Sequence, residues 1–175
     1  MQTANELARN GEVKCALCHG LLRIHGCYRR QLKDKEGNCQ DGWVAQGYCS
    51  VCNQYPSLIP DFIMPYKHYE AKVIECVLME AEEGGNVERQ SDCAADASTM
   101  RRWIRQFRER GARAVGWLSS VLFEIYARHV SILELYNKKL FKQLARLLRE
   151  YPVPASGTVI GKVNVILTRY NCGFL

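Results

Sequence analysis

Four cysteines are arranged in two pairs with the spacing of a metal site. Two residues separate Cys15 from Cys18 and Cys49 from Cys52, and 30 residues lie between the pairs. Two tight turns of this kind can surround one ion with four thiolates, the ligand set of structural zinc sites. We therefore expect these four cysteines to bind one Zn²⁺ with a structural role, because the full set leaves no open position for a catalytic water. The alternatives are four unmetallated thiols or a redox pair, although the βαβ context of a redox pair is missing.

The positive charge of the chain is concentrated in one segment. The net charge is +6, yet residues 97–114 hold six Arg and only one acidic residue, Glu109, whereas residues 66–96 hold three basic residues against eight acidic ones. A local basic block of this kind indicates a polyanionic partner. An ordinary surface helix would interleave several Glu residues with its Arg residues for support, and this segment does not.

Within this block, the pattern "STMRRWIRQFR" predicts a helix over residues 98–108 that begins at a Ser98 cap and ends near Gly111. Its apolar positions follow the helical repeat and form one stripe, made of Met100, Trp103, Ile104 and Phe107. The other faces carry the residues that we expect to contact DNA: Ser98, Thr99, Arg101, Arg102, Arg105 and Arg108. Arg can bond two acceptors of guanine at once, and Thr can contact a thymine methyl group. Arg110 and Arg113 should lie beyond the helix end, where only phosphates are in reach.

The helix over residues 98–108 has the neighbours of a recognition helix. A short helix is predicted over residues 87–93 and a turn over residues 94–96, and an amphipathic helix over residues 66–84 ends at a Gly-Gly pair. Together they predict a tri-helical helix-turn-helix domain over residues 66–110, whose last helix enters the major groove. The alternative is a solvated basic helix in an all-α bundle.

Two regions flank this predicted domain. Between the cysteine pairs, "LLRIHGCYRRQL" and "GWVAQGY" predict two paired strands, and "SLI" after the second pair predicts a third. These strands and the metal site form a zinc ribbon over residues 13–60. Residues 55–65 contain three prolines, so this linker cannot be a regular helix. Residues 112–175 predict a helical C-terminal extension. The expected fold class is mainly α, with a small β zinc ribbon at the N-terminus, a helix-turn-helix core and C-terminal helices.

The apolar positions of the extension leave two arrangements open. A near-heptad seam consists of Leu118, Leu122, Ile125, His129, Ile132, Tyr136, Leu140, Leu144 and Leu147. Such a seam is typical of a coiled coil and would make a homodimer through the C-terminal helices. Further apolar residues such as Val115 and Val121 widen this face, which favours two helices, broken near residues 130–137, that fold back on the core. The pattern predicts no role for the tail over residues 151–175.

Two segments resemble parts of known mobile-element proteins. "CALCHG…YCSVCNQYPSLIPDFIMPY" resembles the N-terminal zinc ribbon of bacterial insertion-sequence transposases, and "ASTMRRWIRQF" is similar to the helix-turn-helix that follows such ribbons. Over about residues 13–110, the chain resembles a little-characterised bacterial family, often described as transposase-like, with the same order of parts. The resemblance implies that the four paired cysteines bind metal and that the helix over residues 98–108 reads DNA. It implies no established reaction.

These patterns predict a cytoplasmic DNA-binding protein that is not an enzyme. No apolar run is long enough for a signal peptide or a membrane span. After Asp96 the chain has no Asp and only four Glu, so it lacks the carboxylate cluster with which transposases hold two metal ions. We expect a transcriptional regulator or a mobile-element factor that binds double-stranded DNA without its own nuclease. The alternatives are a zinc-ribbon adaptor for an acidic protein surface and the DNA-binding subunit of a multi-component transposase.

Overall fold

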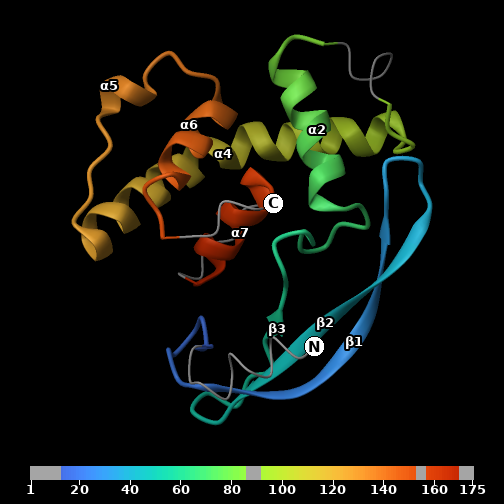
Figure 1. Cartoon of the computed structure of the whole chain (residues 1–175), viewed down its shortest axis with the longest axis vertical. Helices are drawn as coiled ribbons and strands as arrows, with labels where there is room; N and C mark the ends of the chain where they lie inside the picture. The colour runs from blue at the N-terminus through green and yellow to red at the C-terminus, as the bar shows by residue number, and fades with distance from the viewer. Residues whose placement is uncertain (1–12, 86–91, 153–156, 170–175) are drawn as a thin grey trace.

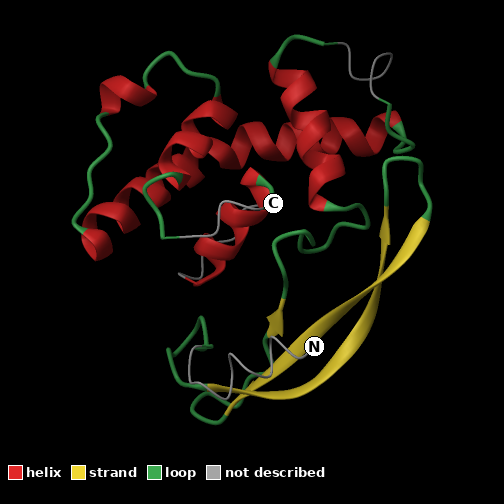
Figure 2. Ribbon diagram, in the orientation of Figure 1, coloured by secondary structure: helices red, strands yellow, loops and turns green. Residues whose placement is uncertain are grey.

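A small antiparallel sheet precedes a set of helices in the computed structural model, which describes residues 13–85, 92–152 and 157–169 (Figures 1 and 2). The sheet has the order β1 (Leu22–Lys33), β2 (Cys39–Cys49) and β3 (Ser57–Leu58). The predicted strands and the N-terminal position of the sheet are therefore confirmed. A mainly helical chain with a small β unit is the fold class that the patterns indicated.

Strands β1 and β2 form a long hairpin that connects the cysteine pairs to the helices (Figure 1). At one end Leu22 packs beside Cys15 and Cys49. Leu32, near the other end, and Val44, in the middle of β2, pack against Ile63. The register shifts between Ile24 and Gly26, which is a β-bulge, and bulges bend a hairpin. Because each end has its own small apolar cluster, the hairpin is anchored both at the cysteines and beside the helices.

The proline-containing segment over residues 55–65 is a packed part of the fold. It contains β3, and its Ile63 and Met64 are fully buried. Pro56 supplies a carbonyl that accepts a hydrogen bond of 2.9 Å from the Gly47 N–H. The segment therefore covers the hairpin at one end and enters the helical core at the other.

Four helices share one hydrophobic core: α2 (Ala71–Glu82), α4 (Ala97–Tyr126), α6 (Leu140–Leu148) and α7 (Val159–Arg169). The long helix α4 lies at the centre, and α2, α6 and α7 all contact it. Its buried stripe follows the 3.6-residue period and consists of Met100, Trp103, Phe107, Gly111, Ala114, Leu118 and Leu122. The predicted apolar stripe is thus confirmed and extends further than expected. None of the helices described in the structure is both long and apolar enough to cross a bilayer.

The predicted end of the basic helix near Gly111 is wrong, because α4 continues to Tyr126. Gly111 is buried where α6 begins, and a methyl group at this position would lie 3.0 Å from Leu140 Cγ and closer still to Cδ2. The glycine permits a close helix contact and does not stop the helix. Arg110 and Arg113, which were expected beyond the helix end, therefore lie within it. The helix instead ends at Ala127, which has a φ of 50°.

The predicted Ser98 cap is also wrong, because Asp96 caps α4. The Asp96 carboxylate accepts hydrogen bonds from the Thr99 N–H at 2.9 Å, the Thr99 hydroxyl at 2.8 Å and the Ser98 hydroxyl at 2.5 Å. The Ser98 hydroxyl, followed by the Thr99 groups, holds the pKa of Asp96 well below its ordinary value. Asp96 satisfies a free N–H of the first turn, and Ser98 lies inside that turn.

The helix-turn-helix itself is not shown. The short helix predicted over residues 87–93 falls largely outside the described residues, and Asp92 and Cys93, which are described, lie in no helix. The domain boundary expected at residues 110–112 stays a prediction, although α4 crosses it and both predicted ranges contribute to the same core.

The C-terminal segment folds back on the core, as the second of the two expected arrangements predicts. The chain leaves α4 after Tyr126, forms the short α5 (Ile132–Leu135) and returns as α6. Of the near-heptad seam, Leu118, Leu122, Leu144 and Leu147 are buried in the shared core, while Ile132 and Tyr136 are exposed. The tail, for which no role was predicted, contributes α7, whose Ile160, Val163 and Leu167 are buried in this core.

Candidate metal centre and basic helix face

Two turns with the same backbone pattern hold the cysteine pairs. In the first turn the Cys15 N–H donates to the Gly20 carbonyl at 2.8 Å, and in the second the Cys49 N–H donates to the Gln54 carbonyl at 2.9 Å. The residue directly after each pair has a left-handed φ, 58° at His19 and 55° at Asn53. This conformation reverses the chain after each pair, so both sulfurs of a pair face the other turn.

The four sulfurs form a cluster that could hold a metal ion. All four lie within 4.8 Å of one another. The closest approaches join the two turns, with Cys15 Sγ 3.7 Å from Cys52 Sγ and Cys18 Sγ 3.4 Å from Cys49 Sγ. A tetrahedral site with Zn–S bonds of about 2.3 Å has edges of about 3.8 Å, so the cluster has the size and the donor set that zinc uses. The structure brings together the four cysteines that the spacing predicted.

Thiols in this cluster differ in how readily they ionise without a metal. A hydrogen bond from the Cys52 backbone N–H is the main reason that the pKa of Cys49 is lowered to about 7. Burial, and then the neighbouring Cys18, Cys49 and Cys15 thiols, raise the pKa of Cys52 to about 12. Four thiolates therefore do not coexist here at neutral pH unless a cation compensates their charge.

Gly20 lies where the two cysteine turns touch. A methyl group on Gly20 would lie 2.7 Å from Val51 Cγ2 and 3.3 Å from Cys49 Sγ. The left-handed residue of the first turn is His19, not Gly20. The role of Gly20 is to allow the second turn to approach.

The predicted DNA-contacting residues occupy the exposed side of the first turns of α4. Arg101, Arg102, Arg105 and Arg108 are exposed, and Arg113 is exposed further along the helix. Arg105 forms a 4.0 Å ion pair with Glu109, and both side chains are mostly exposed. Ser98 and Thr99 differ from the arginines, since both hydroxyls donate to Asp96. The face opposite the buried stripe is therefore a row of guanidinium groups.

Lys67 is a buried basic residue that the sequence patterns did not single out. It is 8% exposed, and its Nζ donates to Gln106 Oε1 of α4. Burial, and then the charges of Arg102 and Arg110, lower its pKa. A lone lysine in a segment between a proline-containing linker and a helix carries no sequence signal for burial.

The fold and site define a protein in which a four-cysteine sheet unit is followed by a helical core with an arginine-rich face. A family model described as a domain of unknown function (DUF6431) matches residues 15–103, just over half of the chain, and the chain belongs to this family. The match begins at the first residue of the four-cysteine cluster, Cys15, and ends at Trp103 in α4. Neither the curated proteins nor the solved structures gave a match.

Proposed function

We propose that this protein is a zinc-containing, transposase-like DNA-binding protein, either a transcriptional regulator or a mobile-element factor without its own nuclease. The observation that carries the proposal is the division of α4 into two faces. Met100, Trp103 and Phe107 are buried on one side, and the arginines of the predicted DNA surface are exposed on the other. The buried side fixes the helix to the core, and this leaves the basic side available for a polyanion.

Electrostatics supports duplex DNA as that polyanion. Residues 97–114 contain six Arg and only one acidic residue. Duplex DNA carries one negative charge per about 1.7 Å of its axis, and a row of basic side chains that neutralises these charges releases bound counterions. Arginine also matches both the phosphate oxygens and the guanine edge in two-point geometry. A single helix face can therefore supply both affinity and base recognition.

Helix α4 is too long to lie wholly in a major groove. Its 30 residues span about 45 Å, whereas a straight helix runs beside the groove for only a few turns before the groove curves around the duplex. We propose that the first turns, with Arg101 and Arg105, meet base edges in the manner of a recognition helix. Arg108 and Arg113 lie further along and hold the phosphate backbone.

The metal centre has a structural role in this proposal. Cys15, Cys18, Cys49 and Cys52 would hold Zn²⁺, which supplies folding energy to a sheet unit too small to bury a core of its own. The hairpin connects this unit to the helices, because Leu32 and Val44 pack on Ile63, whose neighbour Met64 is buried in the helical core. Protein purified without chelator should contain one zinc per chain, and Cys15→Ser should lose it.

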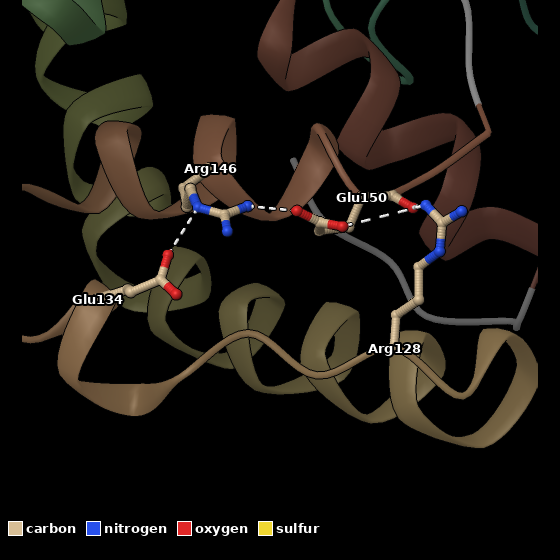
Figure 3. A network of polar contacts seen from close by, with 4 residues as sticks. All are labelled: Arg128, Glu134, Arg146 and Glu150. Atoms are coloured by element: carbon tan, nitrogen blue, oxygen red, sulfur yellow. Dashed lines mark hydrogen bonds and ion pairs between the residues drawn. The ribbon is translucent and has the colours of Figure 1, made fainter.

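A homodimer through the C-terminal helices is part of the proposal. Figure 3 shows how α5 is held: Arg146 Nε lies 2.9 Å from Glu134 Oε2, and Arg146 Nη1 lies 2.7 Å from Glu150 Oε1. Arg128 joins the same network through Glu150. With α5 held in this way, the apolar side chains of Ile132, Leu133 and Tyr136 face solvent. Such a patch marks an interaction site, and a dimer would read two half-sites.

Duplex binding tests the proposed function against the adaptor alternative. The pure protein should bind random duplex DNA at low salt. The logarithm of its binding constant should fall linearly with the logarithm of the salt concentration. An adaptor for an acidic protein surface would not prefer duplex DNA over an acidic polypeptide of equal charge. Cleavage of the duplex with Mg²⁺ or Mn²⁺ would contradict the absence of a nuclease.

A further inference from the structure

A basic cavity lies where the far end of the hairpin meets the first turns of α4. Its volume is about 360 Å³, and its lining includes Lys33, Tyr66, Lys67, His68, Asp96 and Arg102. The hairpin supplies Lys33, the segment before α2 supplies Lys67 and His68, and α4 supplies Arg102. Three parts of the chain that are far apart in the sequence therefore bring cations to one cavity.

Lys67 has no anionic partner among the described residues. Its ammonium group donates to a neutral amide, that of Gln106, and the charges that act on it most are those of Arg102 and Arg110. A buried ammonium group beside like charges is costly unless an anion compensates it. An arrangement of this kind is expected where a ligand supplies the missing negative charge.

The backbone around Lys67 is held firmly in place. Arg30 donates from Nη2 to the Met64 carbonyl at 3.1 Å and to the Lys67 carbonyl at 2.7 Å. The end of β1 pairs with the same segment, since the Lys33 N–H donates to the His68 carbonyl at 2.7 Å. The cavity is thus built by the fold and does not depend on the chance position of one flexible side chain.

Tyr66 marks the rim of this cavity. It has a φ of 58°, a left-handed conformation that is unusual for a tyrosine, and its side chain is 95% exposed. This conformation turns Tyr66 toward solvent while the next residue, Lys67, points inward. Strain of this kind is found at ligand sites more often than elsewhere.

We propose that this cavity binds a phosphate group, with Lys67 and Arg102 as its principal cations and Tyr66 at its rim. This inference rests on the proposed function, which makes the backbone of duplex DNA the source of the phosphate. A free phosphate is the alternative source. In this proposal Arg102 contacts the phosphate backbone and not a base edge. Asp96 also lines the cavity, but both of its oxygens accept hydrogen bonds from Ser98 or Thr99.

Titration of the full chain with inorganic phosphate tests the cavity separately from DNA. The backbone amide resonances of residues 66–69 should shift with phosphate and should not shift with chloride at the same ionic strength. Lys67→Met removes the charge and keeps an unbranched side chain one atom shorter, so it should abolish this shift and raise the thermal midpoint. Lys142→Met, an exposed residue on α6, is the matched control and should leave the shift intact.

Duplex DNA distinguishes the two sources. If the phosphate belongs to the DNA backbone, Lys67→Met and Arg102→Gln should weaken selected and random duplexes alike and lower the salt slope by about one. If phosphate shifts residues 66–69 but no duplex binds, the cavity takes free phosphate and the proposed function is wrong. If both variants keep the full phosphate response, the cavity proposal is wrong. If Lys67→Met does not fold, the phosphate and duplex measurements on Arg102→Gln alone test the proposal.

Discussion

At the scale of single residues, we expect the four-cysteine cluster to depend on one contact outside the cysteines. Gly20 allows Val51 and Cys49 of the second turn to approach the first, so a side chain there should force the turns apart. We expect Gly20→Val to weaken zinc binding by about tenfold or more, the size typical of changes around a metal's ligands. Competition with a chromogenic chelator measures this.

Gly26 provides a matched control for Gly20→Val. A methyl group at Gly26 meets nothing within 4 Å, so Gly26→Ala should keep the zinc affinity. Equal affinities of Gly20→Val and the wild type would show that the two turns are not held at this contact.

Asp96 makes the stability of the helix start depend on pH. Its pKa in the folded protein lies below the ordinary value of about 3.9, so its contribution is present above that pH and is lost as the pH falls below it. Asp96→Ala should therefore be less stable than the wild type at neutral pH, and the difference should shrink below about pH 4. Urea unfolding of both proteins across pH measures the difference. A gap that stays constant down to pH 2 would mean that the charge of Asp96 is not what caps α4.

At the scale of elements, two glycines of α4 have opposite roles. Gly111 is buried against Leu140, whereas a methyl group at Gly116 meets nothing within 4 Å. Alanine is favoured over glycine in a helix by about 1 kcal/mol. Gly116→Ala should therefore raise the thermal midpoint, and Gly111→Ala should lower it because the methyl group displaces α6.

A double variant separates crowding from other causes. Leu140→Ala removes the atoms that Gly111→Ala would meet, so the double variant should lose less stability than the sum of the two single changes. Strict additivity of the two changes would contradict the close contact between α4 and α6.

The elements were predicted from the sequence where periodicity or spacing determines them locally. The strands of the hairpin and the stripe of Met100, Trp103 and Phe107 follow from their own patterns. The length of α4 could not be predicted locally, because a glycine at such a position usually marks the end of a helix. Only the close contact with Leu140 of α6 explains why Gly111 lies inside α4. The cap was misplaced by two residues because Asp96 and Ser98 are both good capping residues.

At the scale of the whole molecule, the residues after the family match complete the core. Two glutamates of α2 bind the first turns of the C-terminal helices: Glu82 Oε2 accepts from the Phe141 N–H at 3.1 Å, and Glu75 Oε2 accepts from the Ile160 N–H at 3.0 Å. Helices α6 and α7 cover α2 and α4 with apolar side chains. Sequence patterns indicated an apolar face for the segment that contains α6 but predicted no role for the tail that contains α7. The surfaces that these helices cover depend on contacts distant in the sequence.

A truncated chain tests whether the helical part is one cooperative unit. A fragment that ends at Tyr126 lacks Leu144, Leu147, Ile160 and Val163, all of which are fully buried in the full chain. We expect this fragment to lose cooperative thermal unfolding of its helices, although its zinc content should persist. A sharp helical transition in the fragment would instead support the independent domain predicted over residues 66–110.

The most direct test of the central claim uses the exposed arginines of α4. Bound sequences are selected from a random duplex pool, and the affinities of selected and random duplexes are then measured across salt for folded variants. Arg101→Ala and Arg105→Ala should cost about 1–3 kcal/mol on the selected site and narrow its advantage over random DNA. Arg108→Ala and Arg113→Ala should weaken both duplexes alike and lower the salt slope by about one. Unchanged binding in all four variants, with helical content retained, would contradict the claim that this face of α4 binds DNA.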